Sequence, residues 1–472
     1  MKKRIKVFGL LISIIAFFTS VVFAYSYESL EKQDLKLLGD TIIRKNQTIE
    51  NKSFESTRDY ENSILIKGCK VTLKNPTIKK SGGKNNDIGE EFGVNSAILT
   101  VEKSSLNLVG GKIIADGEFA HGLYSYIDSN IVVKDTNIKT YKPNSNGLMT
   151  NGEGKISGTN LNVVTLGSLS SAIKAKGSGG SITVKKGTYT TSGINSPVIN
   201  SSSNVEVSNA VLKANKSSSI TLQGSGNISL DKVNLQSTDL TSLRNYIHKN
   251  IFIYNNDAKN IEQSIFKSKK STITTNQGST FFITNANTKI DLIDNTFINK
   301  TTDFLKVLSN NYGTKDNNGG NVSLNMRKQK VNGNITVDKL STLSMDLSDN
   351  SFYKGVINKN NTANNISVTL DIDSKIVLDD DSYITSLVNE DSNNSNIYLN
   401  GHKLFVNGKE VTANDKYIEK KNNKNNKKED SNFSNIIKTI IPILKGTAIL
   451  FIVIAIIMFF VYLNNRKHNK MF

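Results

Sequence analysis

The chain has 472 residues, of which 37% are hydrophobic and 7% aromatic, with four prolines, no tryptophan and one cysteine. A single cysteine excludes an internal disulfide, so the folded part must be stable without cross-links. The net charge of +18 does not indicate a nucleic-acid groove, because residues 1–24 contribute +4 and residues 415–472 contribute +7. The 390 residues between them carry only +7.

The N-terminus is typical of a signal peptide. A basic start, MKKRIK, precedes an apolar run at 7–23, and Val22 and Ala24 fit the small −3 and −1 positions of a cleavage site. We predict a signal peptide at 1–24, cleaved after Ala24, with an uncleaved N-terminal anchor as the alternative. Residues 25–59 are predicted to form an N-terminal cap region, in which 28–38 is the cap candidate.

A 25-residue repeat follows the cap region. A small residue or proline precedes an aliphatic residue at each repeat, and these aliphatic positions are 25, 25, 25, 25 and 22 residues apart. They are Ile98, Leu123, Leu148, Ile173, Val198 and Ile220. Between them lie short alternating runs such as 105–108 (SLNL) and 130–133 (NIVV), each followed by a turn. Such a pattern predicts several short strands in every repeat.

The repeat predicts an all-β fold, a single-stranded right-handed parallel β-helix over residues 60–412. Three strands and three turns would make one coil, and stacked coils about 4.8 Å apart would pair every strand with its neighbours. At about 25 residues per coil, this segment gives about 14 coils. A leucine-rich repeat would need a fixed Leu and Asn pattern, and an antiparallel sandwich would not keep the period. Asn, Ser and Thr at the corners should form hydrogen-bonded columns.

The C-terminal part is predicted to tether the solenoid to a membrane. Residues 413–435 form a polar Lys/Asn-rich tether, and 436–463 combine a membrane-proximal segment with a transmembrane helix. Within it, 446–463 is an 18-residue run without a charge, about 27 Å long as a helix. The basic tail at 464–472 is predicted to be cytoplasmic. We therefore expect a single-pass cell-membrane protein with an extracellular ectodomain and a cytoplasmic C-terminus.

Two stretches resemble a known family. They are 91–99 (EFGVNSAIL) and the run 319–408 that begins GGNVSLNMRKQK and ends GHKLFVNG. Both resemble adhesin-like surface proteins of Gram-positive gut bacteria, which are right-handed parallel β-helices with the pectin-lyase-like fold. The resemblance covers about residues 60–412 and implies a cell-surface location, but it brings no catalytic or binding residues. An LPxTG sorting signal is missing before the apolar run, so membrane anchoring is favoured over covalent wall attachment.

The residues do not form a recognisable catalytic pattern. A polysaccharide lyase or hydrolase needs clustered carboxylates, and the densest acidic run, 379–381 (DDD), is interpreted as a solvated corner. His121 is interpreted as a corner residue that is either structural or merely exposed, while His248 and His402 stand alone in the sequence and indicate no metal site. We predict no catalytic residue, no metal site and no cofactor. Cys69 is predicted to be a small buried core residue.

Binding is the better prospect, because solenoids present long faces with regularly spaced side chains. Tyr124, Tyr126 and Tyr141 lie in consecutive early coils, and their rings could stack on sugars. Tyr189 falls at a core-like position and is excluded. The alternative is that these tyrosines rim the corners without a ligand.

The expected function is that of a non-catalytic, adhesin-like surface protein that binds glycans or host or neighbour surfaces. A polysaccharide lyase or glycoside hydrolase and a structural surface-coat protein are the alternatives. The expected partners are an extracellular glycan or surface ligand and the membrane, with no nucleic acid.

Overall fold

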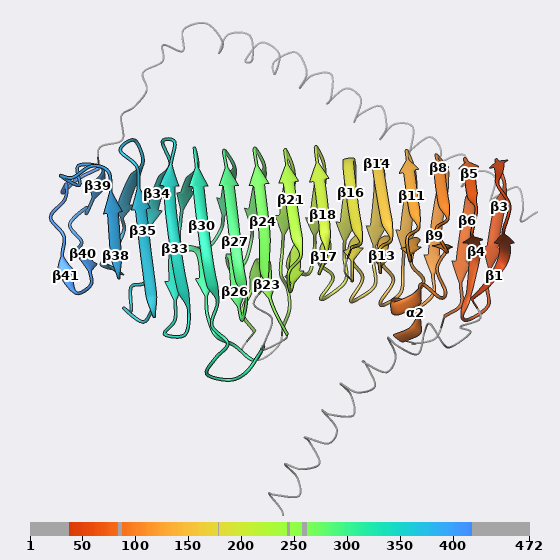
Figure 1. Ribbon diagram of the computed structural model, residues 1–472, viewed down its shortest axis with the longest axis horizontal. Helices are drawn as coiled ribbons and strands as arrows, with labels where there is room; N and C mark the ends of the chain where they lie inside the picture. Colours follow the sequence, from red (N-terminus) through yellow and green to blue (C-terminus); the bar gives the residue numbers. More distant parts are fainter. Residues whose placement is uncertain (1–36, 84–86, 178, 243–245, 257–261, 418–472) are drawn as a thin grey trace, which may run out of the picture. The chain divides into compact units, whose positions relative to one another are not determined.

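The computed structural model describes residues 37–83, 87–177, 179–242, 246–256 and 262–417. These residues form a parallel β-solenoid of the right-handed type, with about 14 turns and about 25 residues per turn. Figure 1 shows the strands of successive turns side by side along the long axis. The predicted all-β parallel solenoid is therefore confirmed, and its strands lie on three faces.

The first face is a 12-stranded parallel sheet. Its strands are β1 (Leu38–Ile43), β4 (Glu61–Lys67), β7 (Ile98–Val101), β10 (Leu123–Tyr126), β13 (Leu148–Asn151), β15 (Ile173–Ala175), β17 (Ile199–Ser201), β20 (Ile220–Gln223), β23 (Lys249–Tyr254), β26 (Ser279–Thr284), β29 (Asp303–Val307) and β32 (Asn334–Val337). A short helix, α2 (Asp87–Phe92), lies between β6 and β7 in the chain.

The second and third faces are joined into one 22-stranded sheet, because β14 (Lys155–Thr165) and β16 (Ser181–Thr191) each run through both faces. The second face also holds β2 (Gln47–Glu50), β5 (Lys70–Lys74), β8 (Ser105–Val109), β11 (Asn130–Lys134), β18 (Asn204–Ser208), β21 (Asn227–Asp231), β24 (Gln263–Lys269), β27 (Asn287–Ile293), β30 (Asn321–Arg327), β33 (Thr342–Ser348), β35 (Asn365–Leu370) and β38 (Ser386–Asn389). The third face holds β3 (Ser53–Ser56), β6 (Thr77–Ser81), β9 (Lys112–Asp116), β12 (Asn137–Thr140), β19 (Val211–Ala214), β22 (Asn234–Ser237), β25 (Thr272–Thr275) and β28 (Thr296–Asn299).

The last turns use two smaller sheets. One contains β31 (Lys330–Asn332), β34 (Phe352–Gly355), β36 (Lys375–Leu378) and β39 (Ile397–Tyr398), and the other contains β37 (Ser382–Ile384), β40 (Leu404–Val406) and β41 (Lys409–Glu410). The β40–β41 pair is antiparallel. A hairpin in place of another parallel turn ends the ladder, which limits the open sheet edge at this end.

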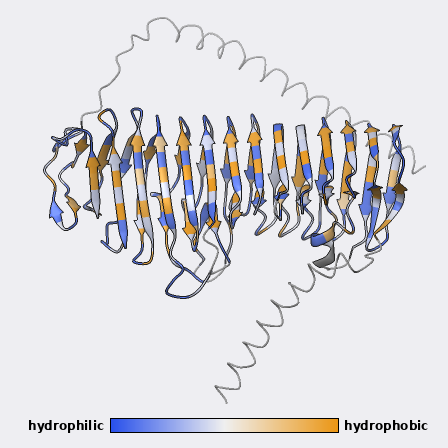
Figure 2. Cartoon of the chain, viewed as in Figure 1, coloured by the Kyte–Doolittle hydropathy of each residue, from blue (hydrophilic) through white to orange (hydrophobic). Residues whose placement is uncertain are grey.

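The core runs through the middle of the stack, because alternate side chains of each strand point inward. Figure 2 shows this alternation as apolar bands that recur across neighbouring strands. Ile98, Leu123 and Leu148 are register partners and are fully buried. Burial of each such side chain stabilises the fold by about 1.5–3 kcal/mol, so the 25-residue period reflects a continuous inner column of aliphatic residues.

Polar ladders hold the corners together, as the sequence predicts. The buried Ser145 N–H donates to Ser170 Oγ at 2.9 Å, and the Ser170 N–H donates to Ser196 Oγ at 3.0 Å. On the outer surface, Asn162 Nδ2 donates to Asn137 Oδ1 at 3.2 Å. Each ladder links equivalent positions of successive turns and so satisfies backbone groups that the strands leave unpaired at the turns.

The stack begins earlier than the predicted boundary at residue 60. Strands β1, β2 and β3 pair in parallel with β4, β5 and β6 of the next turn, so residues 38–56 form a coil rather than a separate cap. Only Ile43 and Phe54 are buried apolar residues in this coil, which made it hard to recognise in the sequence. The predicted cap segment 28–38 lies almost entirely outside the described residues.

The predicted terminal segments also lie outside the described residues. They are the signal peptide at 1–24, the membrane-proximal and transmembrane segment at 436–463 and the tail at 464–472. Within the part of the chain that the structure describes, no helix has the length and apolar character needed to span a bilayer.

The serine ladder can be tested by replacing Ser170 with alanine. We expect Ser170→Ala to lower the free energy of unfolding by about 1–3 kcal/mol, because the buried Ser145 N–H loses its acceptor. The measurement is the urea midpoint of the purified protein. Ser168→Ala is the matched control, since Ser168 is exposed. Equal midpoints for the two variants would show that the ladder contributes nothing.

Candidate functional site

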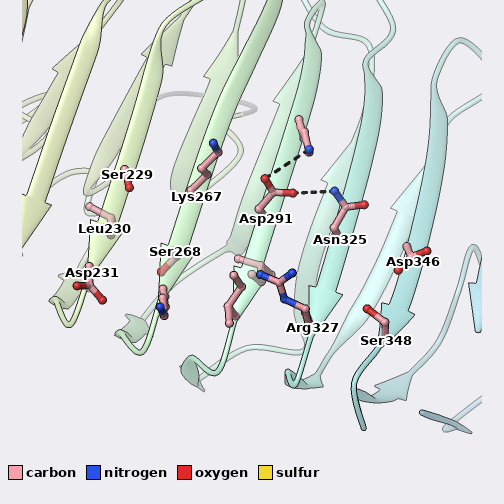
Figure 3. A pocket seen from close by; sticks show the side chains of 14 residues that line it. Ser229, Leu230, Asp231, Lys267, Ser268, Asp291, Asn325, Arg327, Asp346 and Ser348 are labelled. Carbon is pink, nitrogen blue, oxygen red and sulfur yellow. Dashed lines mark hydrogen bonds and ion pairs between the residues drawn. The ribbon is translucent and has the colours of Figure 1, made fainter. Parts of the chain in front are cut away.

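A groove crosses five neighbouring strands of the second face, β21, β24, β27, β30 and β33 (Figure 3), and has a volume of about 560 Å³. Strands β24, β27, β30 and β33 have seven residues each, whereas β5, β8 and β11 have five. The face is therefore broader here. The groove is lined by Ser229, Leu230, Asp231, Lys267, Ser268, Lys269, Lys289, Asp291, Leu292, Ile293, Asn325, Arg327, Asp346 and Ser348.

Strand register places polar side chains of the groove in rows along the solenoid axis. The central row is Ser229, Lys267, Asp291, Asn325 and Asp346, each the register partner of the next. Register partners share a face of the sheet and lie about 4.8 Å apart. An extended ligand along the axis would therefore meet one polar side chain in every turn. Figure 3 shows Lys267, Asp291, Asn325 and Asp346 following one another in this way.

Charges of both signs face the groove. Asp291 accepts a hydrogen bond from Asn325 Nδ2 at 2.7 Å and lies 3.6 Å from the Lys289 ammonium. Arg327 Nε lies 3.9 Å from the Asp349 carboxylate. Among the described residues, no ion pair within 4.0 Å is found for Lys267 or Lys269. These two ammonium groups are therefore available to a ligand.

Asp346 ends the central row and has an unusual environment. Burial raises the pKa of its carboxyl, and the negative charge of Asp371 raises this pKa further, while a hydrogen bond with Ser348 acts in the opposite direction. Asp346 is half-buried. The groove thus has a carboxyl that holds its proton more tightly than usual at one end and ammonium groups nearer its middle.

The structure corrects the predicted tyrosine site, because Tyr124 is fully buried. Its hydroxyl donates to the Glu90 carbonyl at 2.7 Å and lies 3.0 Å from the Glu91 carbonyl, both in helix α2. Tyr124 packs with Leu65, Leu99, Val101 and Met149 on the outside of the first face. The ring therefore holds the helix in place and is unavailable to a ligand.

The other two predicted tyrosines do not form one site with Tyr124. Tyr126 is half-buried and contacts Phe92 of α2 edge-on, with ring centroids 5.9 Å apart. Tyr141 is half-buried, and the Lys139 ammonium lies 4.6 Å from the centroid of the Tyr141 ring. The sequence placed these residues in consecutive coils, but α2, inserted before β7, uses the first two as its docking surface.

Helix α2 is fixed by ion pairs between two of its glutamates and two lysines of the first face. Glu90 contacts the Lys174 ammonium at 2.7 Å, and Glu91 pairs with Lys176. Burial opposes ionisation of Glu90, yet Lys174 and Lys176 outweigh it and hold the pKa of this carboxyl below its ordinary value. His121 lies beneath the helix, fully buried, and burial lowers its pKa to about 4. The structural interpretation of His121 is confirmed.

The interpretation of His402 as an isolated residue is wrong. His402 lies with Asp380 and Asp381, and one ligand atom from each falls within 4.8 Å of the others. The Lys359 ammonium already pairs with Asp380, and Asp381 accepts a hydrogen bond from the Lys403 N–H at 2.9 Å. The corner run 379–381 is thus engaged within the protein, although its donor set could hold a divalent cation.

Two buried residues agree with their predicted roles. Cys69 is 7% exposed and its thiol donates to the Ile43 carbonyl at 3.4 Å. Burial raises the pKa of the thiol, which makes it a poor nucleophile. Tyr189 is fully buried and belongs to the core, as expected.

No protein-family model matches this chain, and a search of curated proteins gives no match. Function is therefore inferred from the chemistry of the groove.

Asp346→Asn tests the environment of the groove carboxyl. Because the pKa of Asp346 is raised on folding, the charged carboxylate destabilises the folded state at neutral pH. We expect the variant to have a higher urea midpoint at pH 7. This gain should shrink as the pH falls through the raised pKa toward about 3.9, the usual value for Asp.

The same measurement in an Asp371→Asn background gives the control. Removal of Asp371 relieves part of the repulsion, so Asp346→Asn should then stabilise less. A destabilising effect of Asp346→Asn at pH 7 would contradict this account of the groove.

Proposed function

We propose that this protein is a non-catalytic, adhesin-like cell-surface solenoid that binds glycans, on host or neighbouring surfaces, through the groove of the second face. The export signal and membrane tether that the sequence predicts would hold the solenoid outside the cell. The ligand would be an extended polysaccharide lying along the solenoid axis.

The central row of the groove is the observation that carries this proposal. Lys267, Asp291 and Asn325 offer a cation, a carboxylate and an amide at successive strand spacings. Sugars present hydroxyl groups at regular intervals, and each can donate to a carboxylate or accept from an ammonium or amide. A groove open along its length accepts a chain of any length, which suits a polymer better than a small molecule.

Binding to immobilised polysaccharides tests the proposal. We expect the purified protein to bind at least one acidic or neutral polysaccharide. The double variant Lys267→Ala, Arg327→Ala should bind it at least about tenfold more weakly, because charge-assisted hydrogen bonds are lost. Raised salt should weaken binding further. Lys213→Ala is the control, since Lys213 is an exposed lysine of the third face. A blank across all polysaccharides, or unchanged binding by the double variant, would count against the groove.

A polysaccharide lyase or glycoside hydrolase is the second candidate, favoured by one observation. Asp346, whose pKa is raised by burial and by Asp371, shares the groove with Asp291 and Arg327, and glycoside hydrolases use a pair of carboxyl groups of which one has a raised pKa. Release of reducing or unsaturated ends from a bound polysaccharide, abolished by Asp346→Asn, would establish catalysis. Binding of the polysaccharide without any product release would support the non-catalytic role instead.

A further inference from the structure

An aromatic patch lies on the first face, away from the groove of the second. We use this name for Phe252, Tyr254, Phe282 and Tyr312. Phe252 and Tyr254 stack with centroids 4.6 Å apart and planes 8° apart, and Tyr312 packs against both at 5.6 and 4.5 Å. Phe282, in the next turn, lies 5.7 Å from Phe252. Phe252 and Phe282 are buried, whereas Tyr254 and Tyr312 are half-buried and form the outer part.

The repeat is lengthened near this patch, and one insertion supplies a ring to it. Register partners of the first face are 31 residues apart from Ile220 to Ile251 and 30 apart from Ile251 to Phe281, compared with 25 in early turns such as β7 to β10. The β29–β30 connection, 308–320, is a further insertion and brings Tyr312 onto Tyr254; it projects beside β26 in Figure 1. Insertions in repeat proteins gather on the binding face.

A buried lysine supports the rings from one side. Lys249 is 7% exposed, and its ammonium lies 4.8 Å from the Phe252 centroid and 5.8 Å from the Phe282 centroid. It also lies 3.8 Å from the ring of Tyr246 and donates to the Ile247 carbonyl at 2.9 Å. Cation–π attraction of this kind fixes the orientation of the rings before any ligand arrives.

The edge of the patch is polar, and a carboxylate acts on each nearby ammonium group, Asp239 on Lys249 and Asp303 on Lys306. The Tyr254 hydroxyl donates to Gln223 Oε1 at 3.2 Å, and Asn318 Nδ2 donates to the Tyr312 carbonyl at 2.9 Å. Lys306, the register partner of Phe282, pairs with Asp303 at 2.7 Å. Asn318 is buried, so the patch offers rigid aromatic surface with the Tyr254 hydroxyl and the Gln223 amide at its edge, which complements an uncharged ligand.

We infer that the aromatic patch is a second binding site, which takes the uncharged sugar rings of a neutral glycan. A pyranose ring has an apolar face that packs on the accessible ring surface of Tyr254 and Tyr312, and hydroxyl groups at its edge that hydrogen-bond to the Gln223 amide. The inference does not depend on the groove, since the two sites use different strands and different chemistry. With both sites occupied, one molecule would bridge two glycan chains and gain avidity for a surface that displays both.

The test uses cellohexaose, mannohexaose and chitohexaose as neutral probes. The chain has no tryptophan, so Tyr254→Trp introduces a single tryptophan, whose emission can be excited selectively, while it keeps an aromatic ring in the patch. We expect the emission of this variant to shift on titration with at least one probe, and the shift to persist in a Lys267→Ala, Arg327→Ala background. That background separates this site from the groove.

Loss of the two tyrosine rings should weaken binding. We expect Tyr254→Ala with Tyr312→Ala to weaken affinity for the same probe at least about tenfold by isothermal titration. Tyr383→Ala is the matched control, because Tyr383 and Phe405 stack at 4.9 Å and 8° in the last turns; it should bind as the parent does. If the double variant fails to fold, Tyr312→Ala alone replaces it in this measurement, because Tyr312 lies in an inserted loop outside the strands. Absence of binding to every one of the three probes, or unchanged affinity in the tyrosine variants, would overturn the inference.

Discussion

In-register parallel stacking is the constraint on which the rest of the structure depends. Each strand pairs with the equivalent strand of the next turn, so residues one period apart occupy the same position about 4.8 Å along the axis. Ile98, Leu123 and Leu148 become one core column, and Ser145, Ser170 and Ser196 one corner ladder. The same rule applies to outward side chains. A long-range binding row is therefore a consequence of the pairing that stabilises the fold.

The two proposed sites arise where the regular repeat is modified. On the second face, strands lengthen to seven residues and broaden the surface into a groove. On the first face, the insertion between β29 and β30 brings Tyr312 onto Tyr254 and completes the aromatic patch. Between early turns, helix α2 instead covers an apolar cluster around Tyr124. An insertion can thus cover part of the solenoid surface or add an aromatic side chain to it, while the stacked core beneath remains continuous.

The sequence predicts the stack well because local alternation and the core column repeat at a fixed spacing. The groove and the helix-docking role of Tyr124 could not be predicted from the sequence, for physical reasons. Lys267, Asp291 and Asn325 are 24 and 34 residues apart, so only the observed register brings them together. Tyr124 looked like a corner residue, since the position of α2 depends on its tertiary contacts with the first face. His402 stands alone in the chain and meets Asp380 and Asp381 only through the pairing of the last turns.

Disulfide trapping across the groove tests the stacking register most directly. Lys267 and Asp291 are register partners, so a Lys267→Cys, Asp291→Cys pair should be about 4.8 Å apart between Cα atoms, within the range for a disulfide. Ser229 and Asp291 are two turns apart and should be about twice as distant. The account predicts that mild oxidation cross-links the first pair within one molecule and leaves the second pair reduced. Equal cross-linking of both pairs, or of neither, would contradict the register and with it the row of side chains in the groove.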